Sequence, residues 1–262
     1  MDSPRDDGQA PGLTVDGPVA ALTVRRPGRL NRLGASDLIE IQRLCGVIGS
    51  RPDIRVVVLT ADTAGQARPV FSAGYDVAGF DGADHDPRLF ERTVDTLAAL
   101  RPVLIAGLNG SVYGGATDLV LACDLRIGQP GLSWRMPACA LGLHYYPSGL
   151  QRYRQAFGPE RARQLFLTAD PVSSDQLHTW GVLMALAEPA DWATRLQALA
   201  QQVAALAPLA TQGTKASLRE LAAGHTDEAV LRAREAACAA SEDFREGRQA
   251  MAERRPPVFK GR

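Results

Sequence analysis

The sequence is poor in the features that mark membrane, disulfide-rich and metal-binding proteins. No apolar run approaches the roughly 18 residues that a membrane-spanning helix needs, and the first twelve residues lack the apolar centre of a signal peptide. Only four cysteines occur in 262 residues, without the spacing of a zinc site. We therefore expect reduced, mostly buried thiols and no bound metal in a cytoplasmic protein.

Excess charge of either sign is absent as well. Lys and Arg together number 29, as do Asp and Glu, so the formal net charge is zero. This balance does not favour a polyanionic partner such as nucleic acid. The chain does have 45% hydrophobic residues, over a length that can bury one large core with an appended helical piece.

The most informative segment lies near the middle of the chain. Pro102–Leu108 has the length and composition of a buried strand, and a turn containing Gly114 and Gly115 follows it. From Ala116 the apolar spacing predicts a short buried helix, and a strand returns at Cys123–Ile127. A glycine turn before a helix collects backbone N–H groups that can stabilise an oxyanion. Such turns also merely redirect the chain, so both interpretations stay open.

Other turns and caps organise the segments around this one. A second strand-to-glycine turn is expected at Phe71–Asp76, Asp16-Gly17 favours a tight hairpin, and Ser36 predicts a helix start. Alternating strands and helices imply right-handed crossovers and a largely parallel sheet. The apolar pattern predicts further strands at Leu13–Val15, Val19–Val24, Ile54–Leu59 and Val182–Ala187, and helices at Arg88–Leu100, Gly149–Phe157, Pro159–Leu167 and Asp175–Trp180.

The chain divides into three parts on this pattern. Residues 1–12 are expected to form a disordered tail, residues 13–188 an α/β core and residues 189–262 a helical module. Beyond Pro189 the apolar spacing is helical throughout, at Trp192–Leu206, Leu209–Ala223, Thr226–Phe244 and Glu246–Glu253. We expect this module to pack against a partner subunit or across its own core.

Six motifs in a fixed order carry a resemblance to a known family. They are RPGRLN, VVVLT, FSAGYDV, the central LNG…GGATDLVLACDLRI, LTADPVSSDQLHTWGVL and the final SEDFREG…RRPPVFKG. Over nearly its whole length the chain resembles the enoyl-CoA hydratase/isomerase (crotonase) superfamily. The resemblance implies a crotonase-like ββα spiral core with a C-terminal helical module, assembled as a homotrimer or a dimer of trimers. It also implies an acyl-CoA thioester substrate, which brings its own coenzyme A, and no separate cofactor.

The resemblance also implies a shared catalytic device. Two backbone N–H groups, one from each glycine turn, hydrogen-bond the thioester oxygen as it becomes an enolate oxyanion. By position these are the amides of Tyr75 and Gly115. The resemblance assigns coenzyme A contacts to Arg26, Arg29, Leu30, Ala73, Phe259 and Lys260, the last two toward a neighbouring subunit. Exposed arginines are also commonly just solvated, so the roles of Arg26 and Arg29 stay open.

Two positions depart from the hydratases of this family. Hydrating a double bond needs a water activated by two carboxylates, and in the hydratases both are Glu. Asp118 stands where the first is expected, and Ala138 follows Pro137 where the second is expected. Because an alanine exchanges no proton, we do not expect ordinary hydratase activity.

A closer likeness is to the methylmalonyl-CoA decarboxylase branch. GSVYGGA at Gly110–Ala116 is similar to a segment of that branch, which also lacks the second Glu and has a tyrosine at the position of Tyr145. Decarboxylating a malonyl-type thioester gives the enolate without a base, and a carboxylate beside the departing one would repel it. Tyr145, with His144, would orient that carboxylate and supply a proton.

Three hypotheses follow, with decarboxylation preferred. The alternatives are an enoyl-CoA isomerase or weak hydratase that uses Asp118, and a non-catalytic acyl-CoA-binding protein. Structural interpretations stand beside them. Asp118 could cap a helix or form a salt bridge inside the core, His144 could face water, and Tyr145 and Tyr146 could only line the acyl pocket.

Overall fold

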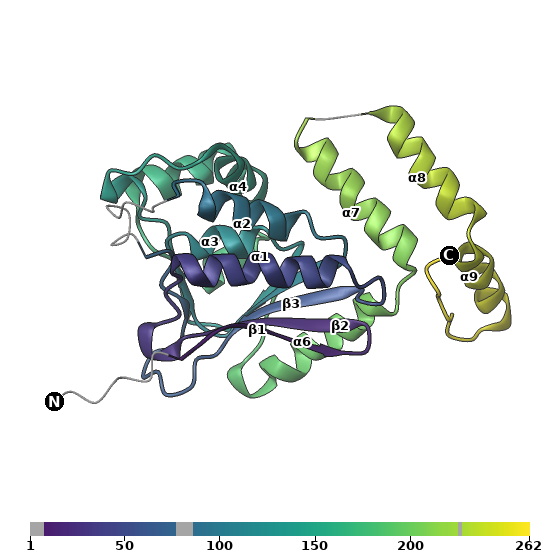
Figure 1. The fold of residues 1–262 in the computed structure, drawn as a ribbon, viewed down its shortest axis with the longest axis horizontal. Coiled ribbons are helices and arrows are strands. Elements are labelled where there is room, and N and C mark those ends of the chain that lie inside the picture. Colours follow the sequence, from purple (N-terminus) through teal and green to yellow (C-terminus); the bar gives the residue numbers. More distant parts are fainter. Residues whose placement is uncertain (1–7, 77–85, 225–226) are drawn as a thin grey trace.

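The computed structural model of the protein describes residues 8–76, 86–224 and 227–262 (Figure 1). Most of the expected N-terminal tail lies outside these residues. The first strand begins at Gln9, four residues before the expected Leu13, so the tail ends earlier than residue 12. The difference arises because Gln9 and Gly12 already pair with the second strand, opposite Arg25 and Thr23.

The larger sheet has six strands, in the order β1-β2-β3-β5-β7-β10. The hairpin of β1 and β2 is antiparallel and turns at Asp16-Gly17 as expected, while the remaining neighbours are parallel. The sequence correctly predicts this largely parallel arrangement. The strands are β1 (Gln9–Asp16), β2 (Val19–Arg25), β3 (Val56–Ala61), β5 (Val103–Leu108), β7 (Leu125–Gly128) and β10 (Ala185–Leu186).

A second sheet, which the sequence does not predict, has four short strands in the order β4-β6-β8-β9. Its members are β4 (Val70–Ser72), β6 (Ser111–Tyr113), β8 (Ser133–Arg135) and β9 (Val172–Ser173). Because β4 and β6 run parallel, their carboxyl ends lie at the same edge. Each of these two ends continues into one of the glycine turns, so the small sheet brings the two turns together.

The helices begin and end close to the expected positions. They are α1 (Ala35–Gly49), α2 (Leu89–Ala98), α3 (Ala116–Leu121), α4 (Pro147–Thr168), α5 (Ser174–Thr179), α6 (Pro189–Ala204), α7 (Pro208–Ala222), α8 (Glu228–Ala240) and α9 (Glu242–Glu253), with short 3-10 turns at Pro27–Arg29 and Cys139–Leu141. The two helices expected on either side of Gly158 are both present within the element labelled α4, and the backbone leaves helical geometry between them at Gly158 (φ +71°, ψ 169°).

Two helix ends differ from expectation. Helix α1 is capped at Gly34 rather than Ser36, because the Asp37 carboxylate accepts a hydrogen bond from the Gly34 N–H at 3.0 Å. The helix expected to run from Thr226 to Phe244 ends at Ala240, and α9 starts after Ser241. The Ser241 hydroxyl caps α9 by accepting from the Phe244 N–H.

Alternate residues of the central strands face two different layers. Val57, Leu59 and Leu104 point into the core shared with α1 to α4, whereas Val56 and Val58 point to the opposite face. Helix α6 covers this second face with Leu196, Ala200 and Ala204, and Figure 1 shows the sheet between these layers.

Helix α6 begins at the expected boundary, residue 189, and packs across the core, which is one of the two arrangements expected for the helical module. Its apolar stripe is buried on the sheet, so α6 belongs to the core. The helices that extend away from the core in Figure 1 are α7, α8 and α9. Helix α7 is tied back to the core by Lys215, whose ammonium group contacts the Pro102 carbonyl at 2.6 Å and the Asp124 carboxylate at 2.8 Å.

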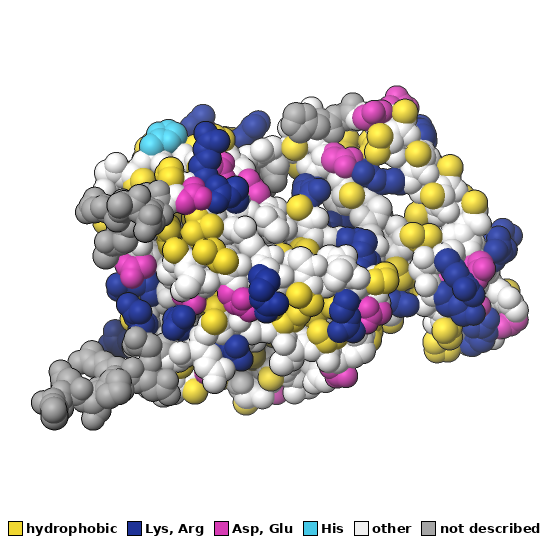
Figure 2. Space-filling view, in the orientation of Figure 1, with side chains coloured by type: hydrophobic (Ala, Val, Ile, Leu, Met, Phe, Trp, Pro, Cys, Tyr) yellow, Lys and Arg dark blue, Asp and Glu magenta, His cyan; other side chains and the backbone are white. Residues whose placement is uncertain are grey.

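Membrane and metal features can be checked over the described part of the chain. No helix there is long and apolar enough to cross a bilayer, and no three His, Cys, Asp or Glu side chains there are grouped as metal ligands. On the face shown in Figure 2, basic and acidic side chains are interspersed. The predicted cytoplasmic location stays a prediction.

The four cysteines are free thiols of unequal exposure. Cys45 and Cys123 are buried, and burial raises the pKa of each to about 12. Cys139 is exposed and Cys238 is partly exposed, so the expectation of mostly buried thiols holds for half of them.

We expect a thiol reagent such as DTNB to modify Cys139 rapidly and Cys238 more slowly in the native protein. Cys45 and Cys123 should react only after unfolding, because a buried protonated thiol is a poor nucleophile. The absorbance of the thiolate that DTNB releases should correspond to two reactive thiols per chain in the native protein. After unfolding in guanidinium it should correspond to four. Rapid modification of a third thiol in the folded protein would contradict this packing.

Candidate active site

A cavity of about 530 Å³ opens where the two glycine turns meet. Aromatic and aliphatic side chains form most of its wall, together with a few polar groups. The lining residues include Arg32, Ala73, Tyr75, Asp76, Phe90, Glu91, Tyr113, Gly115, Met136, Ala138, Leu141, Leu143, His144, Tyr145 and Tyr146. Such a concave, mainly apolar site with a few polar groups is typical of small-molecule binding.

The first turn is held by the loop that precedes it in the sequence. The Leu33 N–H donates to the Gly74 carbonyl and the Asp76 N–H donates to the Leu33 carbonyl, both at 2.9 Å. Successive N–H groups of an extended chain point to opposite sides. Because the Asp76 N–H points toward Leu33, the Tyr75 N–H points away from it.

The second turn contacts the first at Gly74. A methyl group added to Gly74 would lie 2.7 Å from the Tyr113 carbonyl oxygen and 3.1 Å from the Gly115 nitrogen. Gly74 also adopts φ +93°, which favours glycine. Gly115 directly precedes α3, so its N–H belongs to the end of the helix where amides have no intrahelical acceptor. The structure therefore brings the two expected amide donors, Tyr75 and Gly115, to one cavity.

Asp118, the expected catalytic carboxylate, is engaged elsewhere. Its side chain is 0% exposed, and it is not among the described residues that line the cavity. Arg152 of α4 donates to both of its oxygens, at 2.8 and 2.7 Å, and the Tyr146 hydroxyl donates to one of them. The structure therefore supports the salt-bridge alternative for Asp118. It does not support a role for Asp118 as a free base.

Two stacked tyrosines link this ion pair to the cavity. The rings of Tyr145 and Tyr146 lie 4.3 Å apart, and the Tyr145 hydroxyl donates to the Tyr146 hydroxyl at 3.3 Å. Burial and then the charge of Asp118 raise the pKa of both phenols above the ordinary value. Both hydroxyls therefore stay protonated and act as neutral hydrogen-bond donors at neutral pH.

The cavity wall at the second expected carboxylate position is apolar. Ala138 is buried and lines the cavity beside Met136 and Leu141. His144 lines the cavity too, on an exposed turn before α4. Of the five expected catalytic residues, Tyr75, Gly115, Tyr145 and His144 thus meet at the cavity, and Asp118 lies behind it.

The expected coenzyme A contacts are only partly gathered at this site. Ala73 lines the cavity, and its N–H donates to the Leu30 carbonyl at 2.9 Å, so the loop of Arg29 and Leu30 lies beside the first turn. Arg29 and Leu30 are exposed there. Arg26 donates through Nε to both oxygens of the buried Asp37, at 2.9 and 3.1 Å, and its expected contact with coenzyme A stays a prediction.

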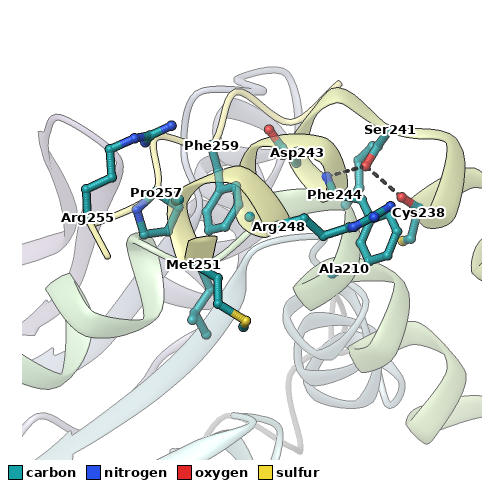
Figure 3. Close-up of a pocket in the computed structure, with 15 residues that line it drawn as sticks. Ala210, Cys238, Ser241, Asp243, Phe244, Arg248, Met251, Arg255, Pro257 and Phe259 are labelled. Carbon is teal, nitrogen blue, oxygen red and sulfur yellow. Dashed lines mark hydrogen bonds between the residues drawn. The ribbon is translucent and has the colours of Figure 1, made fainter. Parts of the chain in front are cut away.

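Phe259 and Lys260 are not among the described residues that line this cavity. Phe259 lines a separate hollow of about 540 Å³ between α7, the end of α8, α9 and the C-terminal segment (Figure 3). Its carbonyl accepts a hydrogen bond from Arg55 at 2.7 Å, and the Lys260 N–H donates to the Asp243 carboxylate at 2.6 Å. Within one chain these tail residues fix the C-terminal segment, and their expected contact with a neighbour's coenzyme A stays a prediction.

Three residues at the site were missed by the sequence analysis. Arg152 lies 34 residues from Asp118, and no local pattern connects them. Arg32 lines the cavity and pairs with Asp76 at 3.7 Å. Glu91 lines the cavity from the first turn of α2, a helix that the sequence predicts without assigning any of its residues to the site.

Comparison with known sequences decides the family. The sequence profile described as enoyl-CoA hydratase/isomerase matches residues 14–262. The chain belongs to the enoyl-CoA hydratase/isomerase family. This confirms the resemblance carried by the glycine turns, and it makes the chain an enzyme of a family that acts on acyl-CoA thioesters.

Several characterised proteins are similar to this family member along nearly their whole length. A crotonyl-CoA hydratase of Syntrophomonas wolfei is 27% identical over 248 residues, which cover 92% of this chain and 94% of that protein. A carnitinyl-CoA dehydratase of Salmonella paratyphi B is 29% identical over 261 residues, which cover 95% and 98%. The crystal structure of an enoyl-CoA hydratase from Bacillus anthracis superposes with a TM-score of 0.87 at 24% identity, covering 97% of this chain and 100% of that one. The last comparison confirms the crotonase-like fold.

Removing Arg152 should strongly destabilise this enzyme. Arg152→Met leaves the Asp118 carboxylate buried with only the Tyr146 hydroxyl, and breaking a buried ion pair in this way costs about 3–5 kcal/mol. The free energy of unfolding, from urea denaturation followed by circular dichroism, measures the loss.

Arg163→Met on the same helix is the matched control, because its ion pair with Glu160 is exposed and should contribute less than about 1 kcal/mol. The double variant Asp118→Leu/Arg152→Met should regain most of the lost stability. Equal unfolding midpoints for Arg152→Met and Arg163→Met would show that the buried ion pair does not support the fold.

Proposed function

We propose that this enzyme decarboxylates a malonyl-type acyl-CoA through a thioester enolate held by the amides of Tyr75 and Gly115. The thioester oxygen would accept a hydrogen bond from each amide. As carbon dioxide leaves, the electron pair of the broken C–C bond enters the enolate, and negative charge builds on that oxygen. A pair of fixed backbone donors stabilises this charge, at about 3–4 kcal/mol for each donor.

The observation that carries the proposal concerns the two positions at which a hydratase has its catalytic carboxylates, Asp118 and Ala138 in this chain. Asp118 is bound at both oxygens by Arg152 and shielded by Tyr146, and the second position is the buried Ala138. Neither position offers a base to the cavity. Loss of carbon dioxide forms the enolate without removing a proton, so this reaction does not need either carboxylate.

Tyr145 supplies the polar contact that a substrate carboxylate needs. It lines the cavity, its raised pKa keeps the hydroxyl protonated, and its bond to Tyr146 is long at 3.3 Å. The hydroxyl can therefore turn toward a bound carboxylate with little loss. His144 lies next to it on the same wall, where the imidazole would return a proton to the enolate.

The alternatives that depend on Asp118 fit the geometry less well. An isomerase or weak hydratase would need the Asp118 carboxylate in the cavity, whereas it is paired with Arg152 behind Tyr146. The hydratases and dehydratases among the relatives are named for their own activities. Binding of acyl-CoA without turnover is the remaining alternative, and the experiments below distinguish it.

The helices beyond the core are proposed to bind other copies of the chain. Several large apolar side chains on α7 and α9 are exposed in one chain, among them Leu218 (61%), Phe244 (50%) and Met251 (82%). Figure 2 shows hydrophobic side chains over this part of the molecule. A homotrimer or a dimer of trimers would cover these surfaces.

The amide pair can be tested at Gly74. Gly74→Ala places a methyl group 2.7 Å from the Tyr113 carbonyl in a backbone conformation that disfavours alanine, so the turn must move and carry the Tyr75 amide with it. We expect kcat/KM for methylmalonyl-CoA to fall about 10²- to 10³-fold.

Gly131→Ala is the matched control, because Gly131 has φ +73° and nothing within 4 Å of an added methyl group. It should carry the same backbone strain without losing turnover. If Gly74→Ala and Gly131→Ala decarboxylate the substrate equally well, the Tyr75 amide does not hold the thioester oxygen.

Decarboxylation itself is tested by carbon dioxide release from methylmalonyl-CoA and ethylmalonyl-CoA, with crotonyl-CoA and a 3-enoyl-CoA assayed in parallel by mass spectrometry. Tyr145→Phe should lower kcat/KM about 10- to 100-fold, because it removes a hydrogen bond to a charged group. Tyr153→Phe is the control, since Tyr153 is buried and its hydroxyl contacts Thr117 outside the cavity.

Each other outcome points to a different function. Conversion of the 3-enoyl-CoA or hydration of crotonyl-CoA, without carbon dioxide release, would replace decarboxylation by the alternative chemistry. Tight binding of every ester with no product would indicate a binding protein.

A further inference from the structure

Of the residues that the structure describes, Asp76 and Glu91 are the carboxylates that line the cavity, and Asp118 lies behind its wall. Asp118 is paired with Arg152, and Asp76 is paired with Arg32. Among the described residues, none donates a hydrogen bond to the Glu91 carboxylate or forms an ion pair with it. Glu91 is half-buried and lines the same cavity as Tyr75 and Gly115.

The neighbouring residue Phe90 fixes Glu91 close to the glycine turns. A methyl group added to Gly115 would lie 2.7 Å from the Phe90 ring, and this ring stacks on Tyr75 with centroids 5.4 Å apart. Phe90 therefore packs against both residues that supply the proposed amide donors. Glu91 follows it in the first turn of α2 and is one of the residues that line the cavity.

A carboxylate in this place has a specific chemical use. The α-proton of a thioester becomes more acidic when its carbonyl oxygen is held by two amides, because the enolate that forms is stabilised. An unpaired carboxylate in a mainly apolar cavity can accept that proton, and a general base contributes about 10²- to 10⁴-fold. Asp118 and Asp76 are less suited, since each is already held by an arginine.

We propose that Glu91 is the general base of a second activity of this site, removal of the α-proton from acyl-CoA thioesters that carry no α-carboxylate. One Glu91 oxygen takes the proton, the C–H electron pair becomes the enolate double bond, and the carbonyl π pair moves to the thioester oxygen. Return of a solvent-exchanged proton from Glu91 regenerates the thioester. The proposal rests on thioester binding at the amides, but not on decarboxylation.

Deuterium exchange in butyryl-CoA tests this step directly. In D₂O the native enzyme should introduce deuterium at the α-carbon, detected by mass spectrometry and proton NMR. Glu91→Gln, which keeps size and shape, should lower the exchange rate at least about 100-fold. Glu160→Gln is the matched control, because Glu160 is 81% exposed on α4 and should leave exchange unchanged.

Carbon dioxide release separates this proposal from the first. If native enzyme exchanged the α-proton of butyryl-CoA but released no carbon dioxide from methylmalonyl-CoA, the Glu91 proposal would stand and the proposed decarboxylase activity would be excluded. The unfolding midpoint of Glu91→Gln, from urea denaturation followed by circular dichroism, should match that of the native enzyme, because Gln keeps the size and shape of Glu. This result shows that the variant is folded.

Two results would overturn the proposal. One is native enzyme that binds butyryl-CoA in calorimetry but does not exchange its α-proton. The other is exchange by Glu91→Gln at the native rate. If native enzyme failed to bind butyryl-CoA, the proposed binding of thioesters at the two amides would be contradicted, and the Glu91 proposal with it. If Glu91→Gln were unfolded, exchange by Glu91→Asp at the native rate would likewise count against it, since the shorter side chain withdraws the carboxylate by about 1.5 Å.

Discussion

The close approach of the two glycine turns is the constraint on which the site depends. Gly74 lies so near the second turn that no side chain fits between them. Its carbonyl accepts a hydrogen bond from the Leu33 N–H, and the Asp76 N–H donates to the Leu33 carbonyl, which leaves the Tyr75 N–H facing the cavity. The short parallel strands β4 and β6 set this approach, since each runs directly into one turn. The fold therefore fixes two amides in place before any substrate binds, and fixed donors need no reorganisation as charge develops.

The second constraint is the burial of Asp118. A buried carboxylate is tolerated only when it is paired, and Arg152 pairs with both of its oxygens. Tyr146 completes the arrangement and stacks on Tyr145, so an ion pair behind the wall also orients the polar groups of the wall. Held in this way, Asp118 does not present a free carboxylate to the cavity. The position expected to transfer protons in a hydratase is occupied here by a packed ion pair, and we propose that proton transfer falls to groups such as Glu91 and His144.

Sequence reasoning reached those parts of the site that depend on local pattern. The strand, glycine turn and helix around Gly115 have strong local signals, and so does the turn at Gly74. Arg152 and Glu91 were missed because their roles depend on which helices pack over the cavity, which the spacing of apolar residues does not specify. The same reason explains α6: its helical pattern is clear in the sequence, but only the structure shows that it covers the sheet.

The most direct measurement of the central claim is a crystal structure of the enzyme with butyryl-CoA bound. The thioester oxygen should lie within about 3.2 Å of the amide nitrogens of both Tyr75 and Gly115. A thioester oxygen directed away from the two glycine turns, or an acyl-CoA bound outside this cavity, would contradict the account.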